Sequence, residues 1–135
     1  MKLPAEMLTT AHYKPPSTEE GWRIVDFPNV LKIATQHQLA CIGGQFQFRG
    51  SFGTAEMYWL NADSSTRGAK EEWVAYVKRA NTEVMTAFEK LTKETDFIQE
   101  AHQWKPIVEA MASGRISDPA QHLFFVAYFK PDISR

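Results

Sequence analysis

The spacing of apolar and polar residues changes several times along the chain, and each change indicates a new element. Between residues 39 and 61, apolar and polar positions alternate in two segments, and Gly50 and Gly53 lie between them. Two alternating segments joined by a short glycine-containing stretch are typical of a β-hairpin. We therefore predict an antiparallel hairpin over 39–61.

The apolar face of this hairpin also predicts its register, because a slip of one residue would mix apolar and polar side chains on both faces. The predicted pairs are Arg49–Thr54, Gln47–Glu56, Gln45–Tyr58 and Gly44–Trp59. One face then collects Phe46, Phe48, Met57 and Trp59. We expect Trp59 to be buried in the core, with Gly44 leaving room for its indole.

Three segments show the spacing of threes and fours that predicts amphipathic helices, at about 28–38, 68–93 and 96–113. Pro28 suits the first turn of the first helix. Glu71 and Glu72 are expected in the first turn of the second helix, where acids complement the helix dipole. Pro106 interrupts the third segment and predicts a kink or a restart, followed by an end at Gly114.

The remaining segments complete the fold prediction. An apolar run within 121–130 is too short for a typical helix and is expected to form a central strand covered on both sides. Residues 1–21 contain three prolines and no sustained period, so we expect an irregular N-terminal arm. The chain is therefore predicted to be a single α+β domain over 1–135, with a small, mainly antiparallel sheet packed against helices.

Composition and charge restrict the class of partner. The chain has 135 residues with 15 Lys and Arg against 16 Asp and Glu, so it lacks the basic surplus expected of proteins that bind nucleic acid or anionic membranes. Its longest apolar run, Leu123 to Phe129, is far shorter than the about 20 residues that cross a bilayer. Pro4 and Glu6 lie where a signal peptide needs apolar residues. We expect a cytoplasmic protein with no nucleic-acid or membrane partner.

The reactive side chains do not form a known chemical motif. His37 and Cys41 are four residues apart, but Cys41 belongs to the predicted strand, where a single free cysteine is expected to pack in the core. The other histidines, His12, His102 and His122, are isolated in the sequence. We therefore predict no catalytic residues, no metal ligands and no cofactor.

The polar face of the hairpin is the main candidate site. It would carry Gln45, Gln47, Arg49, Glu56 and Tyr58, with Phe52 at the tip. Antiparallel sheets commonly expose one polar face to solvent. Tyr and Arg are also enriched in protein interfaces, and amides offer both donors and acceptors, so this face is predicted to bind a protein partner. The acids Glu71 and Glu72, or the 61–67 loop, are the next candidates.

The chain also resembles a known class of proteins over about residues 39–100. The residues that carry the resemblance are Ile42-Gly-Gly-Gln-Phe-Gln-Phe-Arg49, Gly53-Thr-Ala-Glu-Met-Tyr-Trp-Leu60, Glu71-Glu72-Trp73 and Asp96-Phe97-Ile98. They resemble segments of small immunity proteins from bacterial polymorphic-toxin systems, whose toxins are delivered by contact-dependent inhibition or type VI secretion. The resemblance implies a non-catalytic inhibitor that binds a cognate toxin and neutralises it.

Two other functions remain open from the sequence. A small enzyme or ligand-binding protein could use an aromatic pocket between the sheet and the long helices, lined by Trp59, Trp73, Phe88 and Trp104. An adaptor or chaperone for a secreted protein is the other possibility. A toxin gene immediately upstream would favour the immunity function, whereas a metabolic operon would favour the enzyme.

Overall fold

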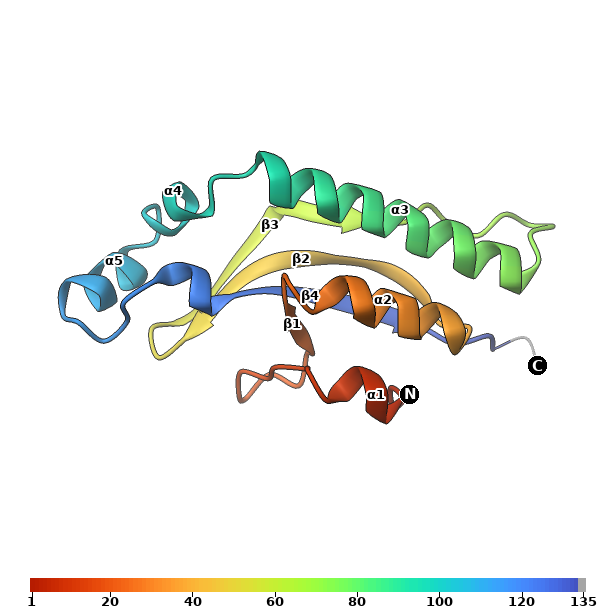
Figure 1. Ribbon diagram of the computed structural model, residues 1–135, viewed down its shortest axis with the longest axis horizontal. Helices are drawn as coiled ribbons and strands as arrows, with labels where there is room; N and C mark the ends of the chain where they lie inside the picture. Colours follow the sequence, from red (N-terminus) through yellow and green to blue (C-terminus); the bar gives the residue numbers. More distant parts are fainter. Residues whose placement is uncertain (134–135) are drawn as a thin grey trace.

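A four-stranded antiparallel sheet with the strand order β1-β4-β2-β3 lies at the centre of the computed structural model, which describes residues 1–133 (Figure 1). The strands are β1 (Gly21–Arg23), β2 (Ala40–Gly50), β3 (Gly53–Asp63) and β4 (Leu123–Lys130). β2 and β3 form the predicted hairpin. β4 lies between β1 and β2, which confirms the central C-terminal strand.

The helices pack against this sheet and confirm the predicted α+β fold. They are α1 (Ala5–Leu8), α2 (Phe27–Gln36), α3 (Trp73–Glu94), α4 (Phe97–Ala101) and α5 (Lys105–Ala112), with the 3-10 helix η1 (Pro119–His122) before β4. α3 contacts β2 and β3, and α2 contacts both α3 and β2. None of the helices in residues 1–133 combines the length and the apolar character that a membrane crossing requires.

Phenylalanine rings from four elements form the centre of the core. Phe27 of α2 lies 4.6 Å from Phe125 of β4 and 4.9 Å from Phe88 of α3, measured between ring centroids. Phe46 of β2 lies 4.9 Å from the same Phe125 ring. These spacings fall in the range in which aromatic rings attract one another beyond their simple burial. Apolar residues of the strands and of the helices therefore pack together in one core.

The hairpin register is as predicted near the tip and differs beyond it. Arg49 pairs with Thr54 and Gln47 with Glu56, but the register shifts between Gln45 and Phe46. Gln45 then pairs with Asn61 rather than Tyr58, and Gly44 pairs with Ala62 rather than Trp59. Residues 58–60 are extra on β3, which is a β-bulge.

This bulge makes the prediction for Trp59 wrong. Leu60 takes the buried position, whereas Trp59 is 43% exposed and stacks on Trp104 with ring centroids 6.2 Å apart. Gly44 leaves room for a different ring, because a Cβ there would lie only 2.6 Å from an edge carbon of Phe125. Strict alternation cannot reveal such a change, since extra residues on one strand reverse which positions face the core.

The start of one predicted helix differs in the structure, whereas the predicted break in another is confirmed. α3 begins at Trp73 instead of residue 68, so Glu71 and Glu72 precede its first turn. The segment 96–113 divides into α4 and α5, and Pro106 lies in the first turn of α5, which confirms the predicted restart. Gly114 follows with a φ of +77°, a conformation that glycine adopts at low cost and that commonly ends a helix.

The N-terminal arm, residues 1–20, is more ordered than predicted. It contains the short helix α1, whose Met7 is buried, and His12 exchanges backbone hydrogen bonds with Gly21. The indole Nε1 of Trp22 donates to the carbonyl oxygen of Met7 at 2.9 Å. In Figure 1 the strands lie between α3 at the top and this arm at the bottom.

Candidate functional site

The sheet has one face toward the helices and a second, which we call the outer face. On β2, Gln45, Gln47 and Arg49 alternate with the core residues Phe46 and Phe48. The strand pairing places side chains of β3 and β4 beside them on the same face, including Glu56, Phe124, Val126 and Tyr128. The polar face predicted from the sequence is therefore part of the outer face.

The N-terminal arm covers half of the outer face, so the prediction that Gln47 and Arg49 lie in solvent is wrong. Gln47 is 1% exposed and Arg49 is 2% exposed. Arg49 Nη1 donates to the backbone carbonyls of His12 at 3.0 Å and Glu19 at 3.1 Å, and its Nε donates to Gln47 Oε1 at 3.1 Å. The His12 ring stacks on Phe124 with centroids 4.0 Å apart.

The physical reason is that arginine carries several fixed donors, and the arm supplies backbone carbonyls to accept from them. Burial lowers the pKa of Arg49 from its ordinary value, although Glu19 opposes this shift. Arg49 thus attaches the arm to the sheet. Within the described residues, it contributes to the fold and has no open position for a partner.

The other half of the outer face is open and forms a shallow hollow of about 210 Å³, which we call the aromatic hollow. Its lining includes Ile42, Gln45, Tyr58, Asn61, Asp63 and Tyr128. Tyr58 is 70% exposed and Tyr128 is 42% exposed. The hollow therefore presents apolar and aromatic side chains where the pairing of β2 with both neighbouring strands shifts its register.

A glycine creates the space at the floor of the hollow. Gly43 lies where β2 shifts its register against β4, and its φ is +154°. A Cβ on Gly43 would lie 2.1 Å from Oδ1 of Asp63. Only a residue without a side chain allows the Asp63 carboxylate to lie over the strand at this point.

Carboxylates surround the aromatic hollow. Glu56 accepts hydrogen bonds from Gln45 Nε2 at 3.3 Å and Gln47 Nε2 at 3.4 Å. The hydroxyl of Tyr128 donates to Glu19, and Asp63 lines the hollow itself. Burial raises the pKa of the Tyr128 hydroxyl, and the hydrogen bond to Glu19 adds to the shift. Tyr128 is therefore a neutral group among negative charges.

Phe52 does not form the exposed anchor expected at the hairpin tip. Its ring is half-buried and lies edge-on to His122, with centroids 5.7 Å apart. His122 Nδ1 is in turn 3.0 Å from the carbonyl oxygen of Arg49. The tip thus packs against the segment that leads into β4.

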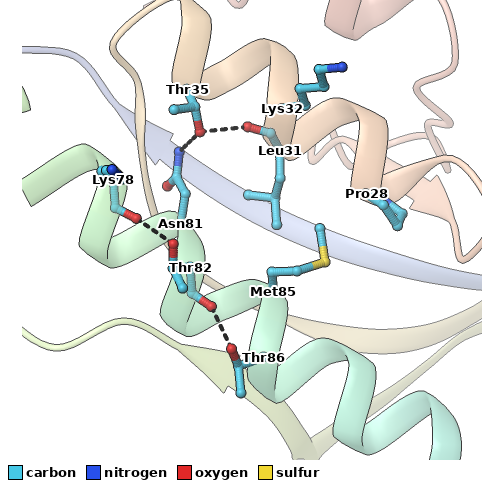
Figure 2. Close-up of a pocket in the computed structure, with 9 residues that line it drawn as sticks. All are labelled: Pro28, Leu31, Lys32, Thr35, Lys78, Asn81, Thr82, Met85 and Thr86. Atoms are coloured by element: carbon cyan, nitrogen blue, oxygen red, sulfur yellow. Dashed lines mark hydrogen bonds between the residues drawn. The ribbon is translucent and has the colours of Figure 1, made fainter.

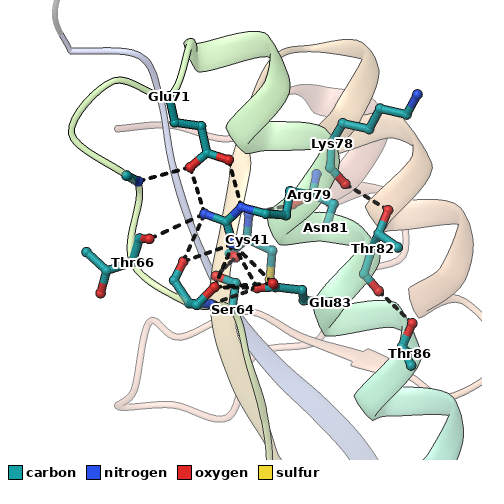
Figure 3. Close-up of polar contacts among 12 residues, drawn as sticks. Cys41, Ser64, Thr66, Glu71, Lys78, Arg79, Asn81, Thr82, Glu83 and Thr86 are labelled. Carbon is teal, nitrogen blue, oxygen red and sulfur yellow. Dashed lines mark hydrogen bonds and ion pairs between the residues drawn. The ribbon is translucent and has the colours of Figure 1, made fainter.

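Glu71 belongs to a network of ion pairs and hydrogen bonds around Arg79 of α3 (Figure 3). Arg79 Nε is 2.7 Å from Glu71 Oε2, and its Nη1 is 3.0 Å from Glu83 Oε1. Arg79 also donates to the hydroxyl of Ser65 at 2.6 Å. The hydrogen bond from Arg79 lowers the pKa of Glu71 to about 2. This network holds the loop 64–72 against α3.

Glu72 behaves differently from its neighbour. It is exposed and occupies the position just before the first residue of α3, with no side-chain capping bond. The structure therefore separates the eight predicted binding residues. Gln45, Glu56 and Tyr58 lie at or beside the aromatic hollow, Gln47 and Arg49 are buried, Phe52 packs at the tip, and Glu71 and Glu72 belong to the start of α3.

A second concave surface lies between α2 and α3, with a volume of about 260 Å³ (Figure 2). Leu31 and Met85 supply apolar surface and two lysines, Lys32 and Lys78, line it. The hydroxyls of Thr82 and Thr86 donate to helix carbonyls at 2.7 and 2.9 Å, as Figure 2 shows. The side-chain hydroxyls of this groove are thus engaged in the helices themselves.

Asn81 at the bottom of this groove is also occupied by structural contacts. Its Oδ1 accepts from the backbone amide of Cys41 at 2.7 Å, and its Nδ2 donates to Thr35 Oγ1 at 2.8 Å and to the Leu39 carbonyl at 3.0 Å. Asn81 is buried and joins α3 to both α2 and β2. The groove is therefore a weaker candidate than the aromatic hollow.

The other residues considered from the sequence, which are Cys41, the possible metal ligands and the aromatic residues, do not form one site in the described residues. Cys41 is buried in the core, as predicted, and burial raises the pKa of its thiol to about 12. In the part of the chain that the structure describes, no group of three or more His, Cys, Asp or Glu side chains could hold a metal ion. The four aromatics of the possible ligand pocket lie in three separate places. Phe88 lies in the core, Trp73 packs on Tyr76, and Trp59 and Trp104 stack on each other.

Sequence reasoning missed the role of Tyr128 and Ile42 in the aromatic hollow, because the strand that contains Tyr128 is expected to be covered on both sides. The 61–67 loop, a secondary candidate, contributes Asn61 and Asp63 to the lining, although both residues belong to β3. The signal that could have located the hollow is the pair Gly43-Gly44, because adjacent glycines in a strand indicate a bulge or a close approach. Comparisons with protein-family models, curated proteins and solved structures give no match for this chain.

Proposed function

We propose that this protein binds a cognate bacterial toxin through the aromatic hollow and neutralises it as an immunity protein. The observation that carries the proposal is the exposure of Tyr58, Tyr128 and Ile42 on one open half of a sheet. Exposed apolar side chains that lie together, in contrast to scattered ones, mark interaction surfaces. The resemblance to immunity proteins supplies the class of partner.

The sheet gives this surface an advantage in binding. β2 is paired on both sides, with β3 and β4, so the backbone under the hollow is already ordered before a partner arrives. Ordering loops or side chains on binding costs free energy, and a preformed surface avoids much of that cost. Tyrosine is also among the residues that most often dominate the energy of an interface.

A toxin inhibitor must bind tightly, so its interface must extend beyond the hollow itself. A standard interface uses about 800 Å² on each partner. Trp59 and Glu56 are both exposed and lie on β3 close in sequence to Tyr58. The hollow would then be the centre of the interface, and these side chains its border.

The test uses the product of the neighbouring gene as the toxin. Cells that express this toxin should grow when the present protein is co-expressed, and the two purified proteins should form a stable complex. Tyr58→Ala should weaken the complex by at least about tenfold, or about 1.4 kcal/mol, and reduce growth rescue. Val74→Ala is the matched control, because Val74 is an exposed apolar residue on α3.

The outcomes separate the proposal from its alternatives. Both variants must melt at the temperature of the parent, since each replaced side chain is largely exposed. If Tyr58→Ala binds as tightly as the parent and Val74→Ala does not, the interface lies on the helices and the proposed surface is wrong. If the parent neither binds the toxin nor rescues growth, the immunity function is wrong.

A further inference from the structure

We propose that the aromatic hollow receives an arginine side chain of the protein partner. This inference deepens the proposed function, and it rests on that function only for the identity of the partner. Its basis is the hydrogen-bonding capacity and the charge of the hollow.

The amide side chains of the hollow use a donor internally. Gln45 Nε2 donates to Glu56, and Asn61 Nδ2 donates to the carbonyl oxygen of Tyr58 at 3.0 Å. Within the described residues, neither Gln45 Oε1 nor Asn61 Oδ1 accepts a hydrogen bond. Both oxygens therefore remain as acceptors in the lining of the hollow.

The charges of the hollow agree with this acceptor character. Asp63 lines it, and Glu56 and Glu19 are bonded to its lining residues Gln45 and Tyr128. A carboxylate only accepts hydrogen bonds. Arg49, on the same face, is buried under the arm and donates to backbone carbonyls and Gln47, and Arg23 lies over Phe124. The hollow thus suits a ligand that carries positive charge and only donates.

An arginine side chain matches the hollow in shape as well. A guanidinium is planar, carries five N–H donors and cannot accept. It stacks on aromatic rings, and Tyr58 and Tyr128 both line the hollow. It also forms paired hydrogen bonds with carboxylates, as Asp63 offers. A lysine ammonium has three donors and no flat surface for stacking, so it uses fewer of these features.

An arginine bound by a tyrosine ring and carboxylates already occurs at α3 of this chain. Arg79 lies over the ring of Tyr76 at 5.3 Å and binds two carboxylates, Glu71 and Glu83. That arrangement of one guanidinium with one tyrosine and two acids is satisfied within the chain. The aromatic hollow presents tyrosines and acids without the guanidinium.

The test measures binding of short peptides by NMR, with no toxin present. The probes are Ac-Gly-Arg-Gly-NH₂, the same peptide with lysine, and the same peptide with citrulline, which keeps the shape of arginine without its charge. The arginine peptide should shift the backbone amides of Ile42, Gln45, Tyr58 and Asp63 with saturable, millimolar affinity. The lysine peptide should bind at least about threefold more weakly, and the citrulline peptide should leave these amides unshifted.

Variants locate the binding in the hollow. Asp63→Asn and Tyr58→Ala should each weaken the arginine peptide by at least about threefold. Glu89→Gln is the matched control, because Glu89 is an exposed acid on α3 and does not line the hollow. Amide spectra that remain native away from the hollow establish that each variant is folded.

Three results would overturn the proposal. They are equal shifts with arginine and citrulline, equal affinity for arginine and lysine, and an equal loss of affinity in Glu89→Gln and Asp63→Asn. The peptide measurement is independent of the toxin assays. Growth rescue without arginine binding refutes this inference alone, and arginine binding without rescue refutes the immunity function alone.

Discussion

At the scale of single residues, the four tryptophans differ in how the fold uses them. Trp22 of β1 is fully buried and donates its indole N–H to Met7, whereas Trp59 is nearly half exposed on the bulge of β3. The guanidinium carbon of Arg67 lies over the Trp73 ring, 5.2 Å from the ring centroid. Residue type alone does not show which tryptophan is buried, because each of them lies near apolar residues in the sequence.

We therefore expect different costs for truncating Trp22 and Trp59. Trp22→Ala should lower the free energy of unfolding by about 3–5 kcal/mol, because it leaves a cavity in the core. Trp59→Ala should lower it by about 1 kcal/mol, mainly through loss of the stack on Trp104. Urea denaturation of both variants measures the difference. Equal losses would place Trp59 in the core and contradict the bulged register.

At the scale of elements, a buried amide joins three of them. Asn81 of α3 bonds the Cys41 amide of β2, the carbonyl of Leu39 and the hydroxyl of Thr35 on α2. Asn81→Ala would leave the first two backbone groups buried without a partner. Each such group costs about 1–3 kcal/mol. We expect a loss of at least about 2 kcal/mol.

Chemical denaturation of Asn81→Ala checks this expectation, and Thr82→Ala is the neighbouring control. Thr82 is exposed, and its hydroxyl bonds only to the helix carbonyl of Lys78. The control should change stability by less than about 0.5 kcal/mol, as surface substitutions usually do. A similar small change in Asn81→Ala would show that water replaces its contacts.

The contact of Glu71 with Arg79 predicts a dependence of stability on pH. The pKa of Glu71 falls from 4.5 to about 2 on folding, first because of the hydrogen bond from Arg79. A group whose pKa is lower in the folded state stabilises the fold above its unfolded pKa, and this contribution disappears as the pH falls through the folded pKa. The contribution of Glu71 is therefore complete above about pH 5 and decreases between pH 4.5 and 2.

Comparison of the parent with Glu71→Gln tests this dependence. Thermal melts should show the parent as the more stable protein at pH 6, and the difference should shrink as the pH approaches 2. Glu72→Gln is a matched control, since Glu72 is exposed and adjacent. Its difference from the parent should stay small at every pH. A difference for Glu71→Gln that is unchanged between pH 6 and 2.5 would contradict the lowered pKa.

At the scale of the whole molecule, the N-terminal arm divides the outer face into a covered and an open half. Arg49 is one of the polar links between arm and sheet, because it donates to the carbonyls of His12 and Glu19. Arg49→Met should keep most of the apolar volume and remove these donors. We expect the arm to detach more often, because hydrogen bonds to charged groups are worth about 1.5–3 kcal/mol.

Limited chymotrypsin digestion can detect this detachment. Tyr13 is exposed on the arm, and its cleavage requires the backbone around it to leave the sheet. Mass spectrometry should show faster cleavage after Tyr13 in Arg49→Met than in the parent. Arg115→Met is the control, because Arg115 is exposed after α5 and donates only to Ser113. Equal cleavage rates in the two variants would mean that Arg49 does not hold the arm.

The sequence by itself determined the elements whose side chains repeat with a fixed period. The hairpin, α2, α3 and the central strand β4 follow from spacing of two or of three and four, because one face of each must be buried. Pro106 and Gly114 likewise acted through their own backbone preferences. These are local properties, so they can be recognised without knowing the neighbours of each segment.

Only the tertiary structure decided which polar residues are buried and where the aromatic hollow lies. Arg49 and Gln47 follow the outer-face alternation like Gln45, but both are buried. The arm supplies the backbone carbonyls to which Arg49 donates, and Gln47 accepts from Arg49, which no side-chain pattern reveals. Trp59 turned outward because extra residues on β3 shifted the pairing after Met57. The hollow needed Tyr128, which is 70 residues beyond Tyr58 in the sequence, to come beside Gly43 through strand pairing. Contacts of this kind join distant segments, so they depend on the folded chain as a whole.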